Sequence, residues 1–484
     1  MSGHPFGHQK VVRISDGPTG ASDFPSEIHR DSSTAARPAT PARLTASKLV
    51  IPIIVGTRPE AIKLVPIIRR LRESDHYEPL VVSTGQHQRM VAYIFKLAGI
   101  APDVVLWAGS RRSQLNERLA SVIRRFEDFC SERFDMPADG VPTPEDILTG
   151  RFPAAVLVHG DTTSAMSAAL SAFHLHIPVM HVEAGLRTGG SNRTPFPEEL
   201  NRQLISCIAG MHFAPTSKNL ENLVRENVPI GQIFVTGNTG IDALQWASTI
   251  DVKFANPALQ ALHDSDRRIV VVTAHRRENW GAGLAGIAEG VRRLADAEPE
   301  ARFVLPLHPN PKVREALAER LSDLANVLLT EPLGYATFAR LLARSHMVIT
   351  DSGGIQEEAP ALGKPVLVVR ETTERTEGVE AGTLRLVGND PERIFSAGSQ
   401  LLNDPVAYAE MAEATNPYGD GRAADRIVRA LEHVLLGGEP PEQFGPGYSR
   451  AAVAHAAGFH LPAPALSPDL ETPDLDITGE YRVG

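Results

Sequence analysis

Acidic side chains stand just after short apolar runs of the sequence, at positions where they could transfer protons. Asp161 and Glu183 each follow such a run, and Glu198 stands at a predicted helix start. Each carboxylate alone has a structural explanation, because Asp caps helices and acids favour the positive end of the helix dipole. Three acids that converge on one rim could instead divide the roles of proton donor and proton acceptor.

Two turns carry groups that suit a phosphate. Gly56-Thr57-Arg58-Pro59 joins an apolar run to a helical pattern, so free N–H groups and the Arg58 guanidinium could meet an anion there. The alternative is a tight turn whose arginine faces solvent. Ser352-Gly353-Gly354 builds a second such turn, and Glu358, about one helical turn later, could accept both hydroxyls of a ribose. The alternative here is a glycine turn with an acidic helix face.

Histidines close two apolar runs in the second half of the chain. His275 is followed by Arg276 and Arg277, which favours an anion pocket, whereas His308 is interpreted as a structural residue. The 17 histidines show no HExxH or clustered Cys/His spacing, and no GxGxxG follows the first apolar run. We therefore expect neither an essential metal nor NAD.

These residues need strands and helices to hold them. Short apolar runs alternate with helical patterns, which predicts parallel sheets wound in βαβ units. About ten strands are more than one compact doubly wound sheet usually holds, so we expect two such α/β domains, with ligands beyond the carboxyl ends of the strands. The predicted strands are 49–55, 80–83, 155–158, 178–182, 233–235, 269–273, 303–307, 327–329, 347–350 and 366–369.

Composition sets the limits of the predicted domains. Segments rich in Pro, Gly, Ser and charge bury too little apolar surface to fold, so both ends of the chain are expected to be disordered. The predicted boundaries are a disordered extension at 1–47, a Rossmann-like domain at 48–238 with a surface insertion at 127–153, a second Rossmann-like domain at 239–420, a helix at 421–438 that returns to the first domain, and a disordered tail at 439–484.

Charge and cysteine content exclude several classes of protein. The 48 basic and 58 acidic residues give a net charge of −10, which argues against nucleic-acid and anionic-membrane binding. Two cysteines cannot form a disulfide scaffold, and no apolar run reaches the roughly 18 residues of a membrane span. We expect a cytoplasmic protein.

Nine stretches, in order along residues 48–436, make the sequence resemble the non-hydrolysing UDP-N-acetylglucosamine 2-epimerases. They are GTRPEAIKLVPII (56–68), TGQHQRM (84–90), VHGDTTSA (158–165), HVEAGLRTG (181–189), PFPEELNRQ (195–203), FVTGNTGIDAL (234–244), TAHRREN (273–279), TDSGGIQEEAPALGKPVLV (350–368) and TTER (372–375). The sequence departs from the family pattern at Leu333, where relatives often carry Gln, at Thr376, where Pro is usual, and at Arg89, where many have Glu or Gln.

The resemblance implies a glycosyltransferase-B-like fold with a cleft between the two domains, a homodimer, and interconversion of UDP-N-acetylglucosamine and UDP-N-acetylmannosamine without NAD, for cell-envelope polysaccharide or glycoconjugate supply. It implies UDP elimination through 2-acetamidoglucal. By resemblance, the catalytic residues would be Asp161, Glu183, Glu198 and His275, and the substrate would be bound by Arg58, Lys63, Leu333, Phe338, Ser352, Gly353, Gly354, Glu358 and Arg375. Gln86 and His87 lie in a stretch that borders a second, activating site in some members.

Other functions remain compatible with the same residues. A hydrolysing 2-epimerase would release UDP and free N-acetylmannosamine, and a related epimerase would act on a modified UDP-sugar. A glycosyltransferase would need an acceptor groove and would not need three acids. A non-catalytic UDP-sugar sensor would not need Asp161, Glu183, Glu198 and His275.

Overall fold

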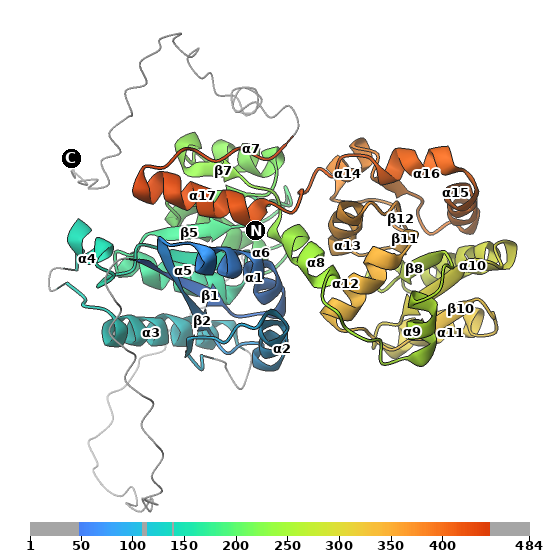
Figure 1. Ribbon diagram of the computed structural model, residues 1–484, viewed down its shortest axis with the longest axis horizontal. Helices are drawn as coiled ribbons and strands as arrows, with labels where there is room; N and C mark the ends of the chain where they lie inside the picture. Colours follow the sequence, from blue (N-terminus) through green and yellow to red (C-terminus); the bar gives the residue numbers. More distant parts are fainter. Residues whose placement is uncertain (1–47, 109–113, 138–139, 446–484) are drawn as a thin grey trace, which may run out of the picture. The chain divides into compact units, whose positions relative to one another are not determined.

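The computed structural model describes residues 48–108, 114–137 and 140–445, which form two parallel β-sheets with flanking helices (Figure 1). The predicted extension at 1–47 and the end of the chain from residue 446 lie outside the described residues. The elements associated with the first sheet are β1 (Leu49–Val55), α1 (Arg58–Glu73), β2 (Tyr77–Ser83), α2 (Gln88–Ala98), β3 (Val104–Val105), α3 (Leu115–Arg133), α4 (Pro144–Leu148), β4 (Val156–His159), α5 (Thr163–His174), β5 (Val179–Val182), α6 (Glu198–Ile208), β6 (Met211–Ala214), α7 (Ser217–Arg225) and β7 (Ile233–Val235).

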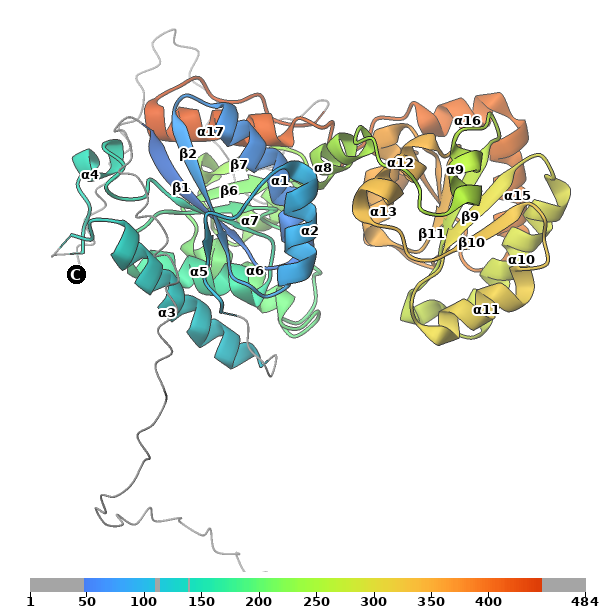
Figure 2. The same cartoon turned by 60° about the horizontal axis from the view of Figure 1, so that its bottom comes forward.

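The second sheet follows from residue 239. Its elements are α8 (Thr239–Ser248), α9 (Pro257–His263), β8 (Ile269–Thr273), α10 (Ala282–Ala297), β9 (Arg302–Pro306), α11 (Pro311–Leu321), β10 (Val327–Thr330), α12 (Tyr335–Arg344), β11 (Met347–Thr350), α13 (Gly353–Glu358), β12 (Val366–Val368), α14 (Thr376–Glu380), β13 (Leu384–Leu386), α15 (Pro391–Asn403) and α16 (Pro405–Ala412). The last helix, α17 (Ala423–Leu436), packs against α1, and the two lie side by side in both views (Figures 1 and 2).

Both sheets bury their two faces, which explains their continuous apolar strands. All seven residues of β1 are buried, and those at odd positions pack with α1 and α17. In the second sheet, Val270 and Val272 pack with α10 and α15, whereas their neighbours Ile269 and Val271 face the side that carries α12. Helices on both faces of a parallel sheet are the doubly wound arrangement that the sequence predicts.

The order of the strands in each sheet shows which turns lie where ligands bind in such folds. The first sheet has the order β3-β2-β1-β4-β5-β6-β7, and the second has β10-β9-β8-β11-β12-β13. The order of the strands therefore reverses between β1 and β4 and again between β8 and β11. Ligands of such sheets bind beyond the strand ends at these reversal points. The turns after these four strands carry Arg58, Asp161, His275 and Ser352.

The structure contains three strands that the sequence analysis missed. They are β3, β6 and β13, which are short or carry a polar residue such as His212 or Arg385. The other strands match the predicted runs within a few residues, and β1, β7, β8 and β11 match at both ends.

Two predicted irregular segments are partly ordered. The segment 127–153, expected as a surface insertion, begins inside α3, where Phe129 and Cys130 are buried. The tail expected to be disordered from residue 439 packs as far as Phe444, which is buried beside β7. Apolar residues at helical spacing in the first case, and one large aromatic side chain in the second, outweigh the polar composition around them.

No helix of the described part of the chain combines the length and the apolar character that a membrane crossing needs.

Candidate active site

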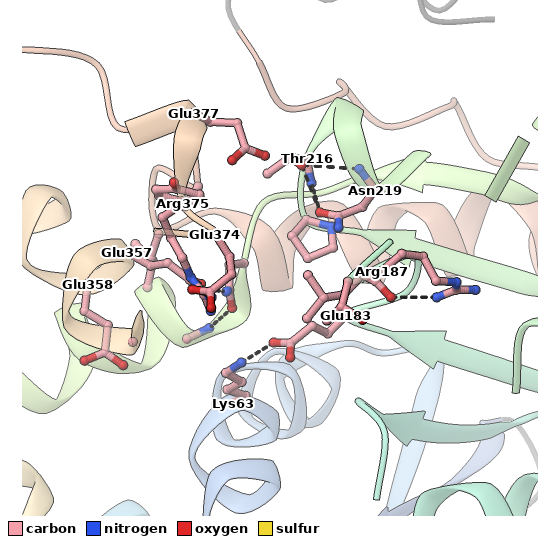
Figure 3. Close-up of a pocket in the computed structure, with 18 of the residues that line it drawn as sticks. Lys63, Glu183, Arg187, Thr216, Asn219, Glu357, Glu358, Glu374, Arg375 and Glu377 are labelled. Carbon is pink, nitrogen blue, oxygen red and sulfur yellow. Dashed lines mark hydrogen bonds and ion pairs between the residues drawn. The ribbon is translucent and has the colours of Figure 1, made fainter. Parts of the chain in front are cut away.

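Residues that follow strands of both sheets line one pocket of about 550 Å³. Figure 3 shows it, with Lys63 directed at Glu183 and with Arg375 beside Glu357 and Glu374. The pocket is lined by Lys63, Glu183, Leu186, Arg187, Thr188, Arg202, Pro215, Thr216, Asn219, Asn238, Gly240, Ile241, Arg276, Gly354, Glu357, Glu358, Glu374, Arg375, Glu377 and Tyr418.

Glu183 is held in the pocket by a lysine. It follows β5 and has a backbone φ of +63°. Residues other than glycine adopt this left-handed conformation at a cost of order 1–3 kcal/mol. The Lys63 ammonium, from α1, donates to its carboxylate, and both side chains are less than a quarter exposed. Burial alone would raise the pKa of Glu183, but Lys63 and then His159, whose Nε2 lies 3.6 Å away, hold it at about 2. Glu183 is therefore a carboxylate at neutral pH.

Asp161 is held by an arginine from α6. Arg202 places Nε 2.9 Å and Nη2 2.6 Å from Oδ2 of Asp161, and its Nη1 donates to Glu199 at 2.8 Å. Burial raises the pKa of Asp161, Arg202 opposes that rise, and the nearby charges of Glu183 and Glu198 add to it. Asp161 therefore accepts a proton more readily than Glu183 does.

The helix-capping explanation of Asp161 does not hold. The residue that caps α5 is Thr162, whose side chain accepts a hydrogen bond from the backbone N–H of Ala165 at 3.1 Å. The side chain of Asp161 is thus free of that structural role and pairs with Arg202 instead.

Glycine brings two arginines close to the first turn of α13. A Cβ added at Gly353 would lie 3.1 Å from Cζ of Arg375 and 3.3 Å from Nη2 of Arg276. Contacts this short leave little room for a side chain. Two guanidinium groups beside the N–H groups of a helix start form a surface that suits a phosphate.

Acidic residues balance this cationic surface. Glu357 lies 2.8 Å from both Nε and Nη2 of Arg375 and accepts from Asn238 at 2.8 Å. Burial and then the charge of Glu357 raise the pKa of Glu358 to about 7, although Lys63 lowers it. Glu358 therefore changes its charge near neutral pH.

The structure gathers some of the predicted residues and leaves others aside. Of them, Lys63, Glu183, Gly354, Glu358 and Arg375 line the pocket. Three more lie beside the pocket because each adjoins a lining residue. Asp161 contacts Arg202, Gly353 contacts Arg375, and His275 precedes Arg276 in the chain. Ser352 caps α13 by position and Glu198 begins α6, and both are half-buried.

The remaining predicted residues are not pocket-lining. Arg58 begins α1 and, with Glu358, affects the pKa of the buried Tyr335. Leu333 and Phe338 pack against the apolar core. Gln86 accepts from the Ser164 hydroxyl at 2.8 Å, and His87 is exposed at the start of α2.

Sequence reasoning assigned no role to Arg202, Glu199 or Glu357. A usable signal was present for the first, because Glu198 and Arg202 stand four residues apart and share one face of α6. Among the described residues, no group of three or more His, Cys, Asp or Glu side chains could hold a metal ion.

Comparison with known proteins identifies one family. Residues 69–432 match the family model described as UDP-N-acetylglucosamine 2-epimerase. The chain is 43% identical over 398 residues to the UDP-N-acetylglucosamine 2-epimerase of Bacillus subtilis (strain 168), which covers 82% of this chain and 99% of the relative. A crystal structure of UDP-N-acetylglucosamine 2-epimerase superposes with a TM-score of 0.72 at 40% identity and covers 83% of this chain and 100% of that one. The enzyme from Neisseria meningitidis bound to UDP-GlcNAc gives a TM-score of 0.64 at 40% identity, over 79% of this chain and 99% of that one.

Proposed function

Since the chain belongs to the family of UDP-N-acetylglucosamine 2-epimerases, which are isomerases, we propose that it interconverts UDP-N-acetylglucosamine and UDP-N-acetylmannosamine in this pocket. Its two doubly wound sheets have the glycosyltransferase-B-like arrangement of related structures. The observation that carries the proposal is the pair Asp161 and Glu183, two carboxylates at adjacent strand ends, each with its own cationic partner. A pocket that only bound a UDP-sugar would not need this pair.

The reaction must invert C2 of the sugar. A proton leaves C2 from one face and another returns to the opposite face, so two acid–base groups are needed. We propose that UDP departs from C1 with the electrons of the C1–O bond while the C2 proton passes to a carboxylate, which leaves 2-acetamidoglucal. UDP then adds back to C1 as C2 receives a proton on its other face. No hydride is transferred, so this route needs no NAD.

Charge at the site suits these steps. Lys63 keeps Glu183 ionised, whereas Asp161, whose pKa is raised by burial, binds a proton more readily. Because the reaction runs in both directions, each carboxylate must take each role in turn. Glu198 is close enough to influence the pKa of Asp161 and is the third member of this proposed group.

The leaving group needs stabilisation where its charge grows. In the proposal, Arg276, Arg375 and the start of α13 at Gly353 receive the diphosphate, together with Ser352, which precedes Gly353, and Arg58 at the start of α1. Donors held in place before reaction stabilise developing negative charge without reorganisation. Glu358 accepts the ribose hydroxyls, and the uracil lies toward Leu333 and Phe338.

A product assay tests the proposal. The full chain is incubated with UDP-N-acetylglucosamine, and proton NMR follows the sugar signals. We expect a mixture of the two UDP-sugars. Free N-acetylmannosamine with UDP would indicate the hydrolysing alternative, and an unchanged spectrum would contradict an epimerase. We also expect Asp161→Asn and Glu183→Gln to lose turnover by roughly 10²–10⁴, whereas the control Asp390→Asn, a cap at the start of α15, keeps it.

The cellular setting follows from the product. UDP-N-acetylmannosamine would supply cell-envelope polysaccharide or glycoconjugate synthesis in the cytoplasm, and we propose a homodimer as the active form. Light scattering of the purified full chain measures the mass of the particle and thus tests the dimer.

A further inference from the structure

One buried carboxylate organises the turn that follows β8. Asp351 directly follows β11 and has no exposed surface. Its Oδ2 accepts three hydrogen bonds, from the backbone N–H of His275 at 2.9 Å, from the backbone N–H of Arg276 at 2.8 Å, and from Nδ2 of Asn279 at 3.1 Å. One oxygen of Asp351 therefore accepts hydrogen bonds from both ends of the 275–279 turn.

The other oxygen of Asp351 faces the His275 ring. Within the described part of the chain, Oδ1 makes no well-aligned hydrogen bond, yet it lies 3.3 Å from Nδ1 of His275. A buried carboxylate oxygen without a donor is unfavourable, because burial removes it from bulk solvent. A small rotation of the imidazole, whose terminal torsion is soft, aligns an Nδ1–H with Oδ1.

The ring is also held from its other side. The imidazole of His308 stacks on that of His275 with ring centroids 5.5 Å apart and an interplanar angle of 8°. The backbone carbonyl of His275 accepts from Nε1 of Trp280 at 3.3 Å. The side chain of His275 is 38% exposed, so with Nδ1 turned to Asp351 the nitrogen available to a ligand is Nε2.

We propose that Asp351 is the positioning residue of His275, which selects the Nδ1–H tautomer and thereby presents Nε2 to the UDP-sugar. This inference rests on the proposed function for its ligand, but the Asp351–His275 pair itself is a property of the free protein. An ion-paired aspartate fixes the tautomer and supports the charged imidazolium without taking the proton. His275 would then share or donate a proton as negative charge grows on the departing diphosphate.

The charged groups around His275 determine its protonation state. Burial lowers the pKa of His275, the Asp351 carboxylate opposes that decrease, and His308 and Arg276 reinforce it. The free imidazole is therefore neutral at neutral pH, and its two tautomers differ in which nitrogen can accept. A bound diphosphate adds negative charge and favours protonation at Nε2, with Asp351 on the opposite nitrogen.

The direct test reads the tautomer. The full chain is labelled with ¹⁵N-histidine, and the signals of His275 are assigned by their loss in His275→Gln. We expect a protonated Nδ1 and a bare Nε2 in the free wild-type protein. A dominant Nε2–H tautomer overturns the proposal, and this measurement needs neither a variant of Asp351 nor any catalytic activity.

The substitution Asp351→Asn adds a functional readout. Its amide oxygen can keep the three donors, while its NH₂ group faces Nδ1 and reverses the tautomer. We expect turnover to fall by roughly 10² with the KM for UDP-N-acetylglucosamine changed less than about threefold, and no further loss when His275→Gln is already present. The control Asp242→Asn changes a buried aspartate that accepts from the backbone N–H groups of Ala423 and Ala424 on α17, and should stay within about twofold of wild type.

Each remaining outcome decides the matter. An equal loss from Asp351→Asn in the presence and absence of His275 assigns Asp351 a purely structural role and overturns the proposal. So does an unchanged tautomer in Asp351→Asn. If the wild-type protein epimerises no UDP-sugar, the proposed function fails, but the ¹⁵N measurement still accepts or rejects the Asp351–His275 pair.

Discussion

Lys63 governs the ionisation of the buried Glu183. The ammonium contacts the carboxylate directly, and the pKa of Glu183 stays at about 2 even though burial acts in the opposite direction. In Lys63→Met the burial that raises the pKa of Glu183 remains, but the ammonium that lowers it is lost, so the pKa of Glu183 rises. We expect turnover at neutral pH to fall roughly 10²-fold, and the acidic limb of the turnover–pH profile to move to higher pH.

The matched control is Lys218→Met. Lys218 pairs with Glu221 at 3.3 Å on the exposed face of α7, where an ion pair has little energetic effect. Its turnover–pH profile should coincide with that of the wild type. A Lys63→Met profile with an unshifted acidic limb would show that Lys63 does not control the ionisation of Glu183.

Glu358 should make nucleotide binding depend on pH. Burial and Glu357 raise its pKa to about 7, so it is largely protonated at pH 6 and ionised at pH 8. Only the carboxylate accepts from both ribose hydroxyls. We expect the ratio of UDP affinities between wild type and Glu358→Gln to be about tenfold larger at pH 8 than at pH 6, measured by titration calorimetry. Because both proteins bind the same UDP, the titration of UDP itself cancels in this ratio.

The exposed Glu410 of α16 supplies the control for that experiment. Glu410→Gln should bind UDP as the wild type does at both pH values. If the affinity ratio for Glu358→Gln is the same at pH 6 and pH 8, Glu358 does not bind the ribose as a carboxylate.

At the scale of elements, the segment after α17 covers the edge of the first sheet. The backbone N–H of Phe444 donates to the carbonyl of Val235 at 2.8 Å, and the side chain of Gln443 accepts from the N–H of Val235 at 2.5 Å. Phe444 is buried against β7 and α7, with the guanidinium of Arg426 5.4 Å from its ring centroid. An edge strand that is covered in this way is protected from pairing with other chains.

A chain that ends at Gly438 should therefore unfold at a temperature several degrees lower than one that ends at Gly445. Phe444→Ala should cost about 3 kcal/mol in the free energy of unfolding, because truncation of a buried aromatic side chain leaves a cavity. The control Phe173→Ala removes a ring that is 57% exposed on α5 and should change stability little. Equal thermal midpoints for the two truncated chains would contradict the role of this segment.

Sequence patterns predicted strands best where burial dominates. β1 was predicted to its ends because every residue of it is buried and apolar. β6 and β13 were missed because His212 and Arg385 interrupt their short apolar runs, and only the neighbouring strands show that the segments complete a ladder. The helical character of residues 127–133 was obscured by the polar residues that share α3 with Phe129.

The site, too, was only partly predictable from the sequence. The strand-end rule placed Asp161 and Glu183 correctly on one rim of the first sheet. The ion pair of Asp161 with Arg202 joins residues 41 positions apart, and that of Lys63 with Glu183 joins residues 120 apart. No local pattern encodes such pairs, because they follow from the order of strands in the folded sheet.

At the scale of the whole molecule, residues associated with both sheets line one pocket. Glu183 follows a strand of the first sheet, with Asp161 beside the pocket through its contact with Arg202, whereas Arg276 and Arg375 come from loops of the second sheet. In the proposed reaction, proton transfer and stabilisation of the leaving group therefore belong to separate halves of the chain. The proposed reaction needs both, because loss of the C2 proton accompanies the departure of UDP.

Epimerisation in heavy water tests this proposed reaction most directly. UDP-N-acetylglucosamine with protium at C2 is converted by the full chain in D₂O, and the product is followed by NMR and mass spectrometry at low conversion. Because the proton that leaves C2 is replaced from solvent-exchanged carboxylates, the UDP-N-acetylmannosamine formed should carry deuterium at C2. A product that retains protium at C2 would contradict proton loss and return through these carboxylates.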